Sequence, residues 1–443
     1  MNTKAKKVLV RIGLILFVII VLVLGVRAIF NFTTGKKLQA YLEKAKSEGV
    51  VMSLKELAPS CDNSDNAALL WKAAEALFIT PDTEGKTLIK QTIEDFFYGR
   101  PLQGESRAKL APLIERNRKV LDLIVEAASR PCFRYGDWKK RPYSIDPSNA
   151  VKMILAIRLF GINTVLRAEA GQVQAALDEL RQGMRFIRRT IDEPILINNL
   201  VALANMKSLL NCFGQIVKGR EMDPAILEAW TKELDLDAWR IKFWRCVEIE
   251  RALALETGLG VVKGDRDILR AELGDHRIFY WLIRPIQKLQ IIWVQDRFKE
   301  SNKIAWMPYY QIKAQAKEKQ AMRQSAPWYF KLSGLLLADF QSVFLKEATL
   351  EAMMLTTKAG LACKIYKNQT GRYPENLDAL VPDFMDAVPT DPFSGKPLIF
   401  RLQDGGVLIY SVGSNGKDDE GRGTYQITQL VMEKDDDWAW KER

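Results

Sequence analysis

The chain has 443 residues, of which 48% are apolar and 27% are charged, and its net charge is +11. This composition excludes a disordered chain, and the length allows two or three domains with cores of their own. Lysine and arginine are spread along the whole chain without an aromatic-basic platform. We therefore expect no nucleic-acid partner, and an anionic membrane surface fits the positive charge better.

The N-terminal segment has the composition of a membrane anchor. Four basic residues, the last of them Arg11, precede an uncharged apolar run over residues 12–26. Residues 8–30 are long enough to cross a lipid bilayer if Arg11 and Arg27 extend toward the headgroups. The basic flank predicts a cytoplasmic N-terminus and export of the remaining chain. The alternative is a cleaved signal peptide that ends near Ala28.

The cysteine pattern does not have the spacing of a disulfide framework or of a metal site. The chain has five widely spaced cysteines and no Cys-x-x-Cys pair, and they are Cys61, Cys132, Cys212, Cys246 and Cys363. An odd count without characteristic spacing argues against a disulfide framework and against a zinc knuckle. Cys212 and Cys363 lie within apolar helical patterns, where we expect buried thiols.

The middle of the chain predicts helices. Residues 151–166 carry apolar side chains at steps of three and four, and residues 173–187 do so again after Gly171. Such a pair predicts an antiparallel helical hairpin similar to a tetratricopeptide unit. No fixed period continues it, so we expect an irregular helical bundle or short array. Residues 131–147 have no helical period and predict an ordered loop on the helical body.

A second apolar stretch covers residues 276–298. Arg284, Pro285 and Lys288 interrupt it too often for a spanning helix. We expect a buried helix here, and the alternative is a helix that lies on the membrane surface.

The residues suited to catalysis are few. His276 is the only histidine, which excludes a zinc site built from two or more histidines. Glu248, Glu250 and Glu256 lie among apolar residues of a predicted helix. They either pair with neighbouring arginines or, in the alternative, act as paired carboxylates of a glycan hydrolase.

The last hundred residues have a different pattern. Apolar side chains at steps of three and four predict one long helix from about residue 341 to Gly371. Two short strands, "KPLIFRLQ" and "GVLIYSVG", then flank a "DGG" turn. This arrangement predicts an antiparallel hairpin.

Five sequence motifs in this region match a known family. They are "GRYP", "LDALVP", "VPTDPFSGKPLIF", "YSVGSNG" and "DDDWAW". In this order they resemble the globular domain of the type II secretion major pseudopilin, protein G, over about the last 90 residues. The whole chain also resembles a group of bacterial membrane-anchored proteins that carry this tail and have no assigned reaction. The resemblance implies a small α+β domain.

In the pseudopilins, the loop after the last strand of the hairpin holds a calcium ion through carboxylates and backbone carbonyls. Carried over, the ligands are Val412, Ser414, Asn415, Asp418, Asp419 and Asp436. Asn415 stands where the family has an aspartate, and "GRGTYQITQLVMEK" separates the two acidic clusters. A hydrogen-bonded Asx/Gly loop without metal is the alternative.

The N-terminal helix does not match a filament subunit. Pseudopilins carry a glutamate at the fifth position after a leader glycine, whereas Val18 holds that position after Gly13. We expect a mainly α protein with an anchor over residues 1–35, a helical domain over 36–335 and a pseudopilin-like α+β domain over 336–443. The predicted function is a non-enzymatic interaction or scaffold protein of the bacterial inner membrane. Its bulk lies on the extracytoplasmic side and binds protein partners of the envelope, and the alternative is a carboxylate-dependent glycan hydrolase of the cell envelope.

Overall fold

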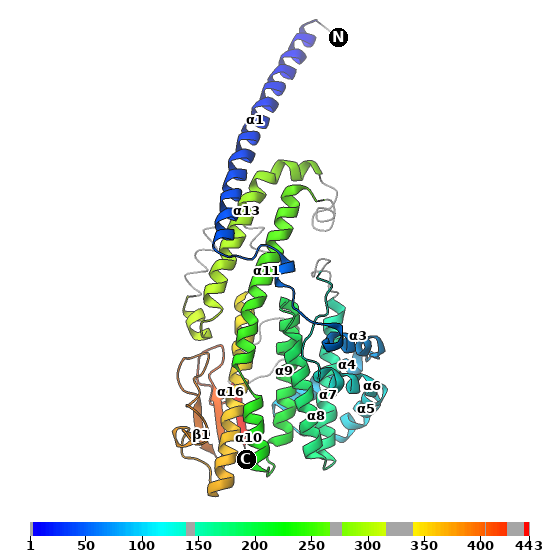
Figure 1. Ribbon diagram of the computed structural model, residues 1–443, viewed down its shortest axis with the longest axis vertical. Helices are drawn as coiled ribbons and strands as arrows, with labels where there is room; N and C mark the ends of the chain where they lie inside the picture. Colours follow the sequence, from blue (N-terminus) through cyan, green and yellow to red (C-terminus); the bar gives the residue numbers. More distant parts are fainter. Residues whose placement is uncertain are drawn as a thin grey trace. The chain divides into compact units, whose positions relative to one another are not determined.

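The computed structural model describes residues 3–138, 147–265, 277–315, 340–403, 405–422 and 438–442. The protein is mainly helical, with an apolar N-terminal helix and a small antiparallel sheet near the C-terminus (Figure 1). The fold class predicted from the sequence is therefore confirmed. The α-helices and strands have the following bounds: α1 Thr3–Ser47, α2 Leu54–Leu57, α3 Ala67–Leu77, α4 Thr83–Phe97, α5 Gly104–Arg116, α6 Arg118–Ala128, α7 Pro147–Glu169, α8 Val173–Thr190, α9 Leu196–Val217, α10 Pro224–Glu233, α11 Asp237–Lys263, α13 Arg277–Ile304, α16 Phe340–Thr370, β1 Ile399–Gln403, β2 Gly406–Ser411 and β3 Trp438–Glu442.

Contacts between residues divide the chain into two compact units. The first unit contains the described residues of Met1–Leu57 and Glu248–Asn302, and the second contains those of Ala58–Val247, Lys303–Gln320 and Asp339–Arg443. These units cut across the three consecutive segments expected from the sequence, because the chain leaves the first unit after Leu57 and returns to it at Glu248. Whether the three predicted segments fold independently is a separate question, so that division stays a prediction.

In the first unit, α1 packs beside α13 in parallel. Lys288 of α13 donates to the carbonyl and the side-chain oxygen of Asn31, at 2.9 and 2.8 Å, and Tyr41 donates to Asp296 further along both helices. A small apolar core joins α1, α11 and α13, and it consists of Leu38, Leu255, Val262 and Ile291. The earlier part of α1 is different, since its apolar side chains from Ile12 to Phe32 are exposed.

Two described helices are long and apolar enough to cross a membrane. One is the segment Arg11–Ser47 of α1, whose apolar window is not buried at all, so it is a candidate membrane span or signal anchor. The other is α9, most of whose window is buried inside the second unit. The burial identifies α9 as a core helix of that unit.

The second unit is built around α7, α8 and α9. Gly171 adopts a φ of 86° between α7 and α8, which is the turn predicted for the helical hairpin. The predicted stripe of α7 is buried from Leu155 to Ile162, whereas Val151 is exposed. A Cβ on Gly183 of α8 would overlap the ring of Phe160 of α7, so this glycine permits the close packing of the two helices.

The C-terminal part of this unit contains α16 and the sheet. The strand order is β1-β2-β3, and both pairs are antiparallel. Ile409 of β2 faces Trp440 of β3, and all residues of β2 are buried. The long helix and the hairpin were predicted, but β3 was not, because "WAWKE" is short, follows an acidic run and has no turn residues that link it to β2.

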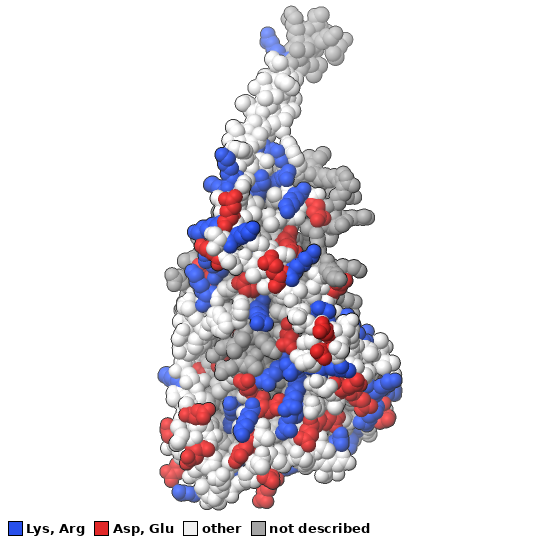
Figure 2. All heavy atoms as spheres, viewed as in Figure 1, with Lys and Arg blue, Asp and Glu red and all other residues white. Residues whose placement is uncertain are grey.

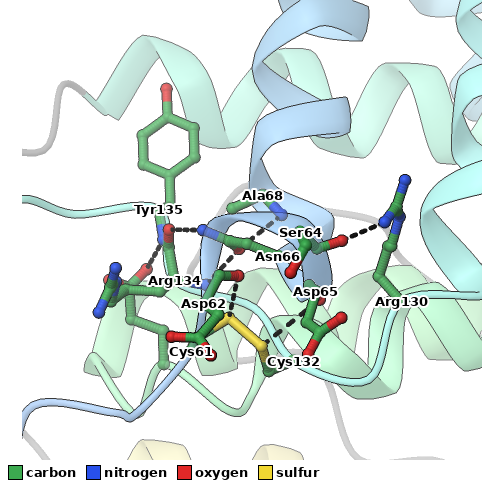
Figure 3. The surroundings of a disulfide bond; sticks show 11 residues. Cys61, Asp62, Ser64, Asp65, Asn66, Ala68, Arg130, Cys132, Arg134 and Tyr135 are labelled. Atoms are coloured by element: carbon green, nitrogen blue, oxygen red, sulfur yellow. Dashed lines mark hydrogen bonds between the residues drawn. A yellow bond between two sulfur atoms is a disulfide. The ribbon is translucent and has the colours of Figure 1, made fainter.

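A disulfide joins Cys61 and Cys132 across 71 residues of sequence (Figure 3). The cysteine spacing argued against a disulfide framework and did not predict this single bond. The other three cysteines are free and buried, which accounts for the odd count and confirms the thiols expected at Cys212 and Cys363. The spacing of the cysteines did not indicate this pair, because the two segments meet only in the folded chain. There the N–H of Ala67 donates to the carbonyl of Cys132 at 2.9 Å.

Candidate functional site

The loop after β2 is organised by Asp418. Its carboxylate accepts hydrogen bonds from the Tyr410 hydroxyl at 2.8 Å, from the backbone N–H of Glu420 at 2.9 Å and from Arg401 at 3.0 Å. These donors, the tyrosine hydroxyl first, lower the pKa of Asp418 below its ordinary value. The carboxylate thus joins the loop to β1 and β2.

The neighbouring predicted ligands are bonded to each other or to nearby cations. The Asn415 amide donates to Asp419 at 2.7 Å, and its oxygen accepts from the N–H of Lys417 at 2.7 Å. The second bond closes an Asx turn. The carbonyl of Ser414 accepts from the ammonium of Lys313 at 2.5 Å.

Asp391 fixes the start of this loop. It accepts from the hydroxyl of Ser411 at 2.7 Å, the N–H of Val412 at 3.1 Å, the N–H of Phe393 at 2.9 Å and the hydroxyl of Ser394 at 2.9 Å. Asp391 is 1% exposed, so its carboxylate is a buried acceptor with four donors. Asp391 lies in the motif "VPTDPFSGKPLIF", but it was not predicted to have a role. The signal that the sequence offers is the Asp-Pro pair with a serine two residues later, which is typical of a turn.

Several of the oxygens assigned to the calcium ion already accept hydrogen bonds from the protein. Both oxygens of Asp418 accept protein donors, and a lysine ammonium already lies against the carbonyl of Ser414. Within the described ranges, no three His, Cys, Asp or Glu side chains are grouped to hold a metal. Asp436 lies outside the described residues. The contacts favour the hydrogen-bonded Asx/Gly loop, and the calcium site stays a prediction.

A second carboxylate centre surrounds Glu193, between α8 and α9. It accepts from the N–H of Gly136 at 2.8 Å, the N–H of Tyr135 at 3.1 Å, the indole of Trp138 at 2.7 Å and the amide of Asn198 at 3.2 Å. Glu193 is 0% exposed, and burial raises its pKa above the ordinary value. The side chain fastens the ordered loop that was predicted before α7 to the helical core.

Glu75 lies near the same loop. It accepts from the Tyr135 hydroxyl at 2.7 Å, and the ammonium of Lys72 lies 4.6 Å from the centre of the tyrosine ring. Glu75 and Glu193 therefore contact opposite ends of one tyrosine. A general acid must reach its substrate, whereas Glu193 is fully enclosed, so the arrangement supports structure better than acid–base catalysis. Sequence reasoning missed both residues, because their partners come from distant segments of the chain.

The carboxylates expected on α11 also have structural partners. Glu248 pairs with Arg251 at 3.0 Å and accepts from Asn302. Glu256 accepts from the hydroxyl of Ser53 and the N–H of Leu54, both at 3.0 Å. These contacts hold α11 against neighbouring parts of the first unit. Glu248 has the arginine partner that was expected, whereas Glu256 bonds a serine and a backbone N–H instead of an arginine. Glu250 also has a bonding partner, and His276 lies outside the described residues.

A cavity of about 30 Å³ lies between α4, α9, α16 and β3. It is lined by polar groups that include Asn211, Lys218 and the indole of Trp440, and burial lowers the pKa of Lys218 to about 8. Asn211 Nδ2 and Trp440 Nε1 have no hydrogen-bond partner among described residues. The volume suits water molecules that would bond these atoms, and it is too small for a substrate.

Comparisons with known proteins add no name to this geometry. No protein-family model matches the chain, and no curated protein and no solved structure matches it significantly. The fold and its sites define the class: a mainly helical protein with an apolar N-terminal helix and a disulfide-bonded body.

Proposed function

We propose that this protein is a non-enzymatic interaction or scaffold protein anchored in the bacterial inner membrane. Residues 8–30 hold it in the bilayer, and the chain beyond them lies on the extracytoplasmic side. About the last 90 residues form a module of the type II secretion pseudopilin kind. The partners are other proteins of the cell envelope.

The disulfide is the observation that carries this proposal. Cys61 and Cys132 both follow the exposed apolar part of α1 in sequence. Disulfides persist in oxidising compartments and are rare in the cytosol. Export of the chain after α1 satisfies this requirement, and the basic residues before Ile12 favour the same orientation.

The placement of the carboxylates supports a non-enzymatic role. Glu248 and Glu256 hold α11 in the first unit, and Glu193 fastens a loop of the second unit. Both oxygens of Glu193 and of Glu248, and one oxygen of Glu256, make contacts within the fold. A carboxylate that acts on glycan needs an open face toward the substrate.

The order of elements supports the pseudopilin-like module. A long helix, α16, precedes the Asp391-Pro392 turn, and a hairpin then leads into a glycine-rich loop. The loop is held by Asp391 and Asp418, which both lie within or beside the motifs that carry the resemblance. The family assignment is part of the proposal.

Two fusions to the C-terminus of the full chain test the orientation. Alkaline phosphatase is active only after export, so we expect an active phosphatase fusion and a dark fusion to green fluorescent protein. Peptide mapping without reductant should show Cys61 linked to Cys132. If the green fluorescent protein fusion is fluorescent and the phosphatase fusion is inactive, the proposal is contradicted.

The hydrolase alternative has a separate test. We expect the purified full chain to release no products from cell-wall glycan. If it does release products, the variants Glu248→Ala and Glu250→Ala decide the cause. Loss of turnover in these variants, with unchanged melting temperature, would replace the scaffold proposal with a carboxylate hydrolase.

A further inference from the structure

Three basic side chains gather where α13 begins beside α1, within the first unit. The guanidinium carbon of Arg27 lies 3.2 Å from the ring centre of Trp281, and its Nε donates to the Trp281 carbonyl at 3.1 Å. Lys288 reaches from α13 to Asn31. Arg284 lies one helical turn from both Trp281 and Lys288, on the same side of α13.

These cations have no acidic partner among the described residues. The ion pairs of this unit join other side chains, such as Lys299 with Glu48 and Arg251 with Glu248. The Nε atom of Arg284 is buried and has no hydrogen-bond partner in the described part of the chain. Lys288, 9% exposed, has its pKa lowered by burial and by the charges of Arg284 and Arg27. Within the described part of the unit, the positive charge of the cluster is therefore not balanced by an acid.

Exposed apolar side chains lie beside the cluster. Trp281 and Leu282 are 45% and 47% exposed, and Ile29 and Phe32 of α1 are 68% and 62% exposed. The apolar surface of α13 thus continues that of the anchor. Figure 2 shows the uncharged stretch of α1 followed by a group of basic side chains.

The cluster lies at the depth expected for lipid headgroups. The exposed apolar stretch of α1 ends at Phe32, and about 20 residues of helix span the hydrocarbon core of a bilayer. Arg27 and Trp281 therefore fall near the outer boundary of that core. Tryptophan is enriched at this boundary, and arginine there extends toward the headgroups.

We propose that Arg27, Arg284 and Lys288 bind the phosphate of an anionic phospholipid, while Trp281 and Leu282 enter the interfacial layer of the same leaflet. Guanidinium groups suit phosphate because they present several N–H donors in one plane. The apolar neighbours favour a lipid over a soluble phosphate, since a soluble ion would leave them exposed to water. This site rests on the membrane anchor of the proposed function.

The test uses the full chain, purified in an uncharged detergent and titrated with phosphatidylglycerol or phosphatidylcholine. Native mass spectrometry counts the lipids retained. We expect the protein to prefer phosphatidylglycerol and the variant R284Q/K288Q to lose about fivefold in affinity for each charge removed. The matched control is K303Q, an exposed lysine of the same helix, which should bind like the unaltered chain.

Further arms separate the explanations. R284K keeps the charge and should retain most of the binding even if R284Q/K288Q proves poorly folded. Equal retention of the two lipids by the unaltered chain, or unchanged binding by R284K and R284Q/K288Q alike, would overturn the proposal. Displacement of the lipid by millimolar inorganic phosphate would overturn it in favour of a soluble anion. All variants should stay in the membrane fraction of cells, and loss of the unaltered chain from that fraction would instead contradict the anchor.

Discussion

Two irregular segments of the second unit are both held by a carboxylate, but in opposite environments. Residues 131–138 are fastened by Glu193, a fully buried side chain that lies far along the chain from them. Residues 411–422 are fastened by Asp418, an exposed side chain of the same loop. Burial raises the pKa of Glu193, whereas hydrogen bonds from Tyr410 and Glu420 lower the pKa of Asp418.

The comparison shows that the structural role of a carboxylate depends on whether its hydrogen-bond donors come from distant or from neighbouring residues of the chain. Most donors around Glu193 belong to a distant segment, so its loss would release tertiary structure. All donors of Asp418 lie within 17 residues of it, so the loss of Asp418 would loosen a turn and the adjacent hairpin. The first segment also has a covalent tie, through Cys132, that the second one does not show among described residues.

The largest expected effect comes from cutting that tie. Replacing Cys61 and Cys132 with alanine should lower the free energy of unfolding by about 4 kcal/mol, because the closed loop of 71 residues restricts the unfolded chain. Denaturant titration of the full chain in detergent measures this free energy. Reductant should also lower the free energy of unfolding of the unaltered protein and leave that of the double variant unchanged. If neither the double substitution nor reductant lowers it, the disulfide is contradicted.

Removing the buried acceptor should have the next largest effect. Glu193→Ala leaves the N–H groups of Tyr135 and Gly136 and the indole of Trp138 without their acceptor, which should cost about 3 kcal/mol. Glu193→Gln keeps one acceptor oxygen and should cost less. The matched control is Glu221→Gln, an exposed acid of the same unit, which should stay close to the unaltered chain. Equal stability of the alanine variant would show that the segment is held by other contacts.

The two acids should impose opposite pH dependence. Because the folded pKa of Glu193 is raised, its contribution is fully present below its ordinary value of 4.5 and is lost as pH rises through the folded pKa. The lowered pKa of Asp418 gives a contribution present above its ordinary value of 3.8 and lost as pH falls through the folded pKa. Unfolding titrations of the unaltered chain, Glu193→Gln and Asp418→Asn between pH 3 and 7 reveal each contribution by difference. Difference curves of the same sign would contradict this assignment.

Removing the exposed carboxylate of Asp418 should change global stability less than the two changes above. Asp418→Asn removes an exposed charge that pairs with Arg401, and such pairs contribute less than about 1 kcal/mol. Hydrogen exchange should nevertheless quicken locally at the N–H of Glu420, which donates to this carboxylate. Lys417→Gln, in the same loop, is the control. A loss of stability well beyond the scale of surface pairs would mean that the loop supports more of the fold.

Calcium should have the smallest effect of all. Hydrogen bonds already engage oxygens of Ser414, Asn415 and Asp418, which are three of the six residues assigned to the ion. We therefore expect the melting temperature of the full chain to be unchanged by chelator or by millimolar calcium. A rise with calcium that Asp418→Asn abolishes would establish the site that the pseudopilin resemblance predicts.

Patterns local in sequence predicted much of this fold. The stripe of α16 follows from a period of 3.6, and the strands β1 and β2 follow from the DGG turn between two short apolar runs. Gly171 and Gly371 marked turns that have positive φ. These features depend on neighbours within a few residues. The same holds for the exposed apolar run of α1.

Features that depend on distant partners were not predicted. The pair Cys61–Cys132, the loop donors of Glu193 and the strand β3 all join segments that lie far apart in the sequence. Asp391 shows the boundary between the two cases. The turn that Asp391 forms with Phe393 is local, and the sequence indicates it. The hydrogen bond from the N–H of Val412 to Asp391 exists only once the chain has folded.

The parallel pairing of α1 with α13 has a consequence for biogenesis. Arg27 leaves the ribosome 254 residues before its partner Trp281. At a synthesis rate of roughly 5–20 residues per second, Trp281 therefore follows after roughly 13 to 50 s. During that interval the stripe of α1 around Leu38 lacks its partner helix. On the proposed topology, we expect nascent chains that stop before residue 277 to recruit envelope chaperones or proteases at this stripe.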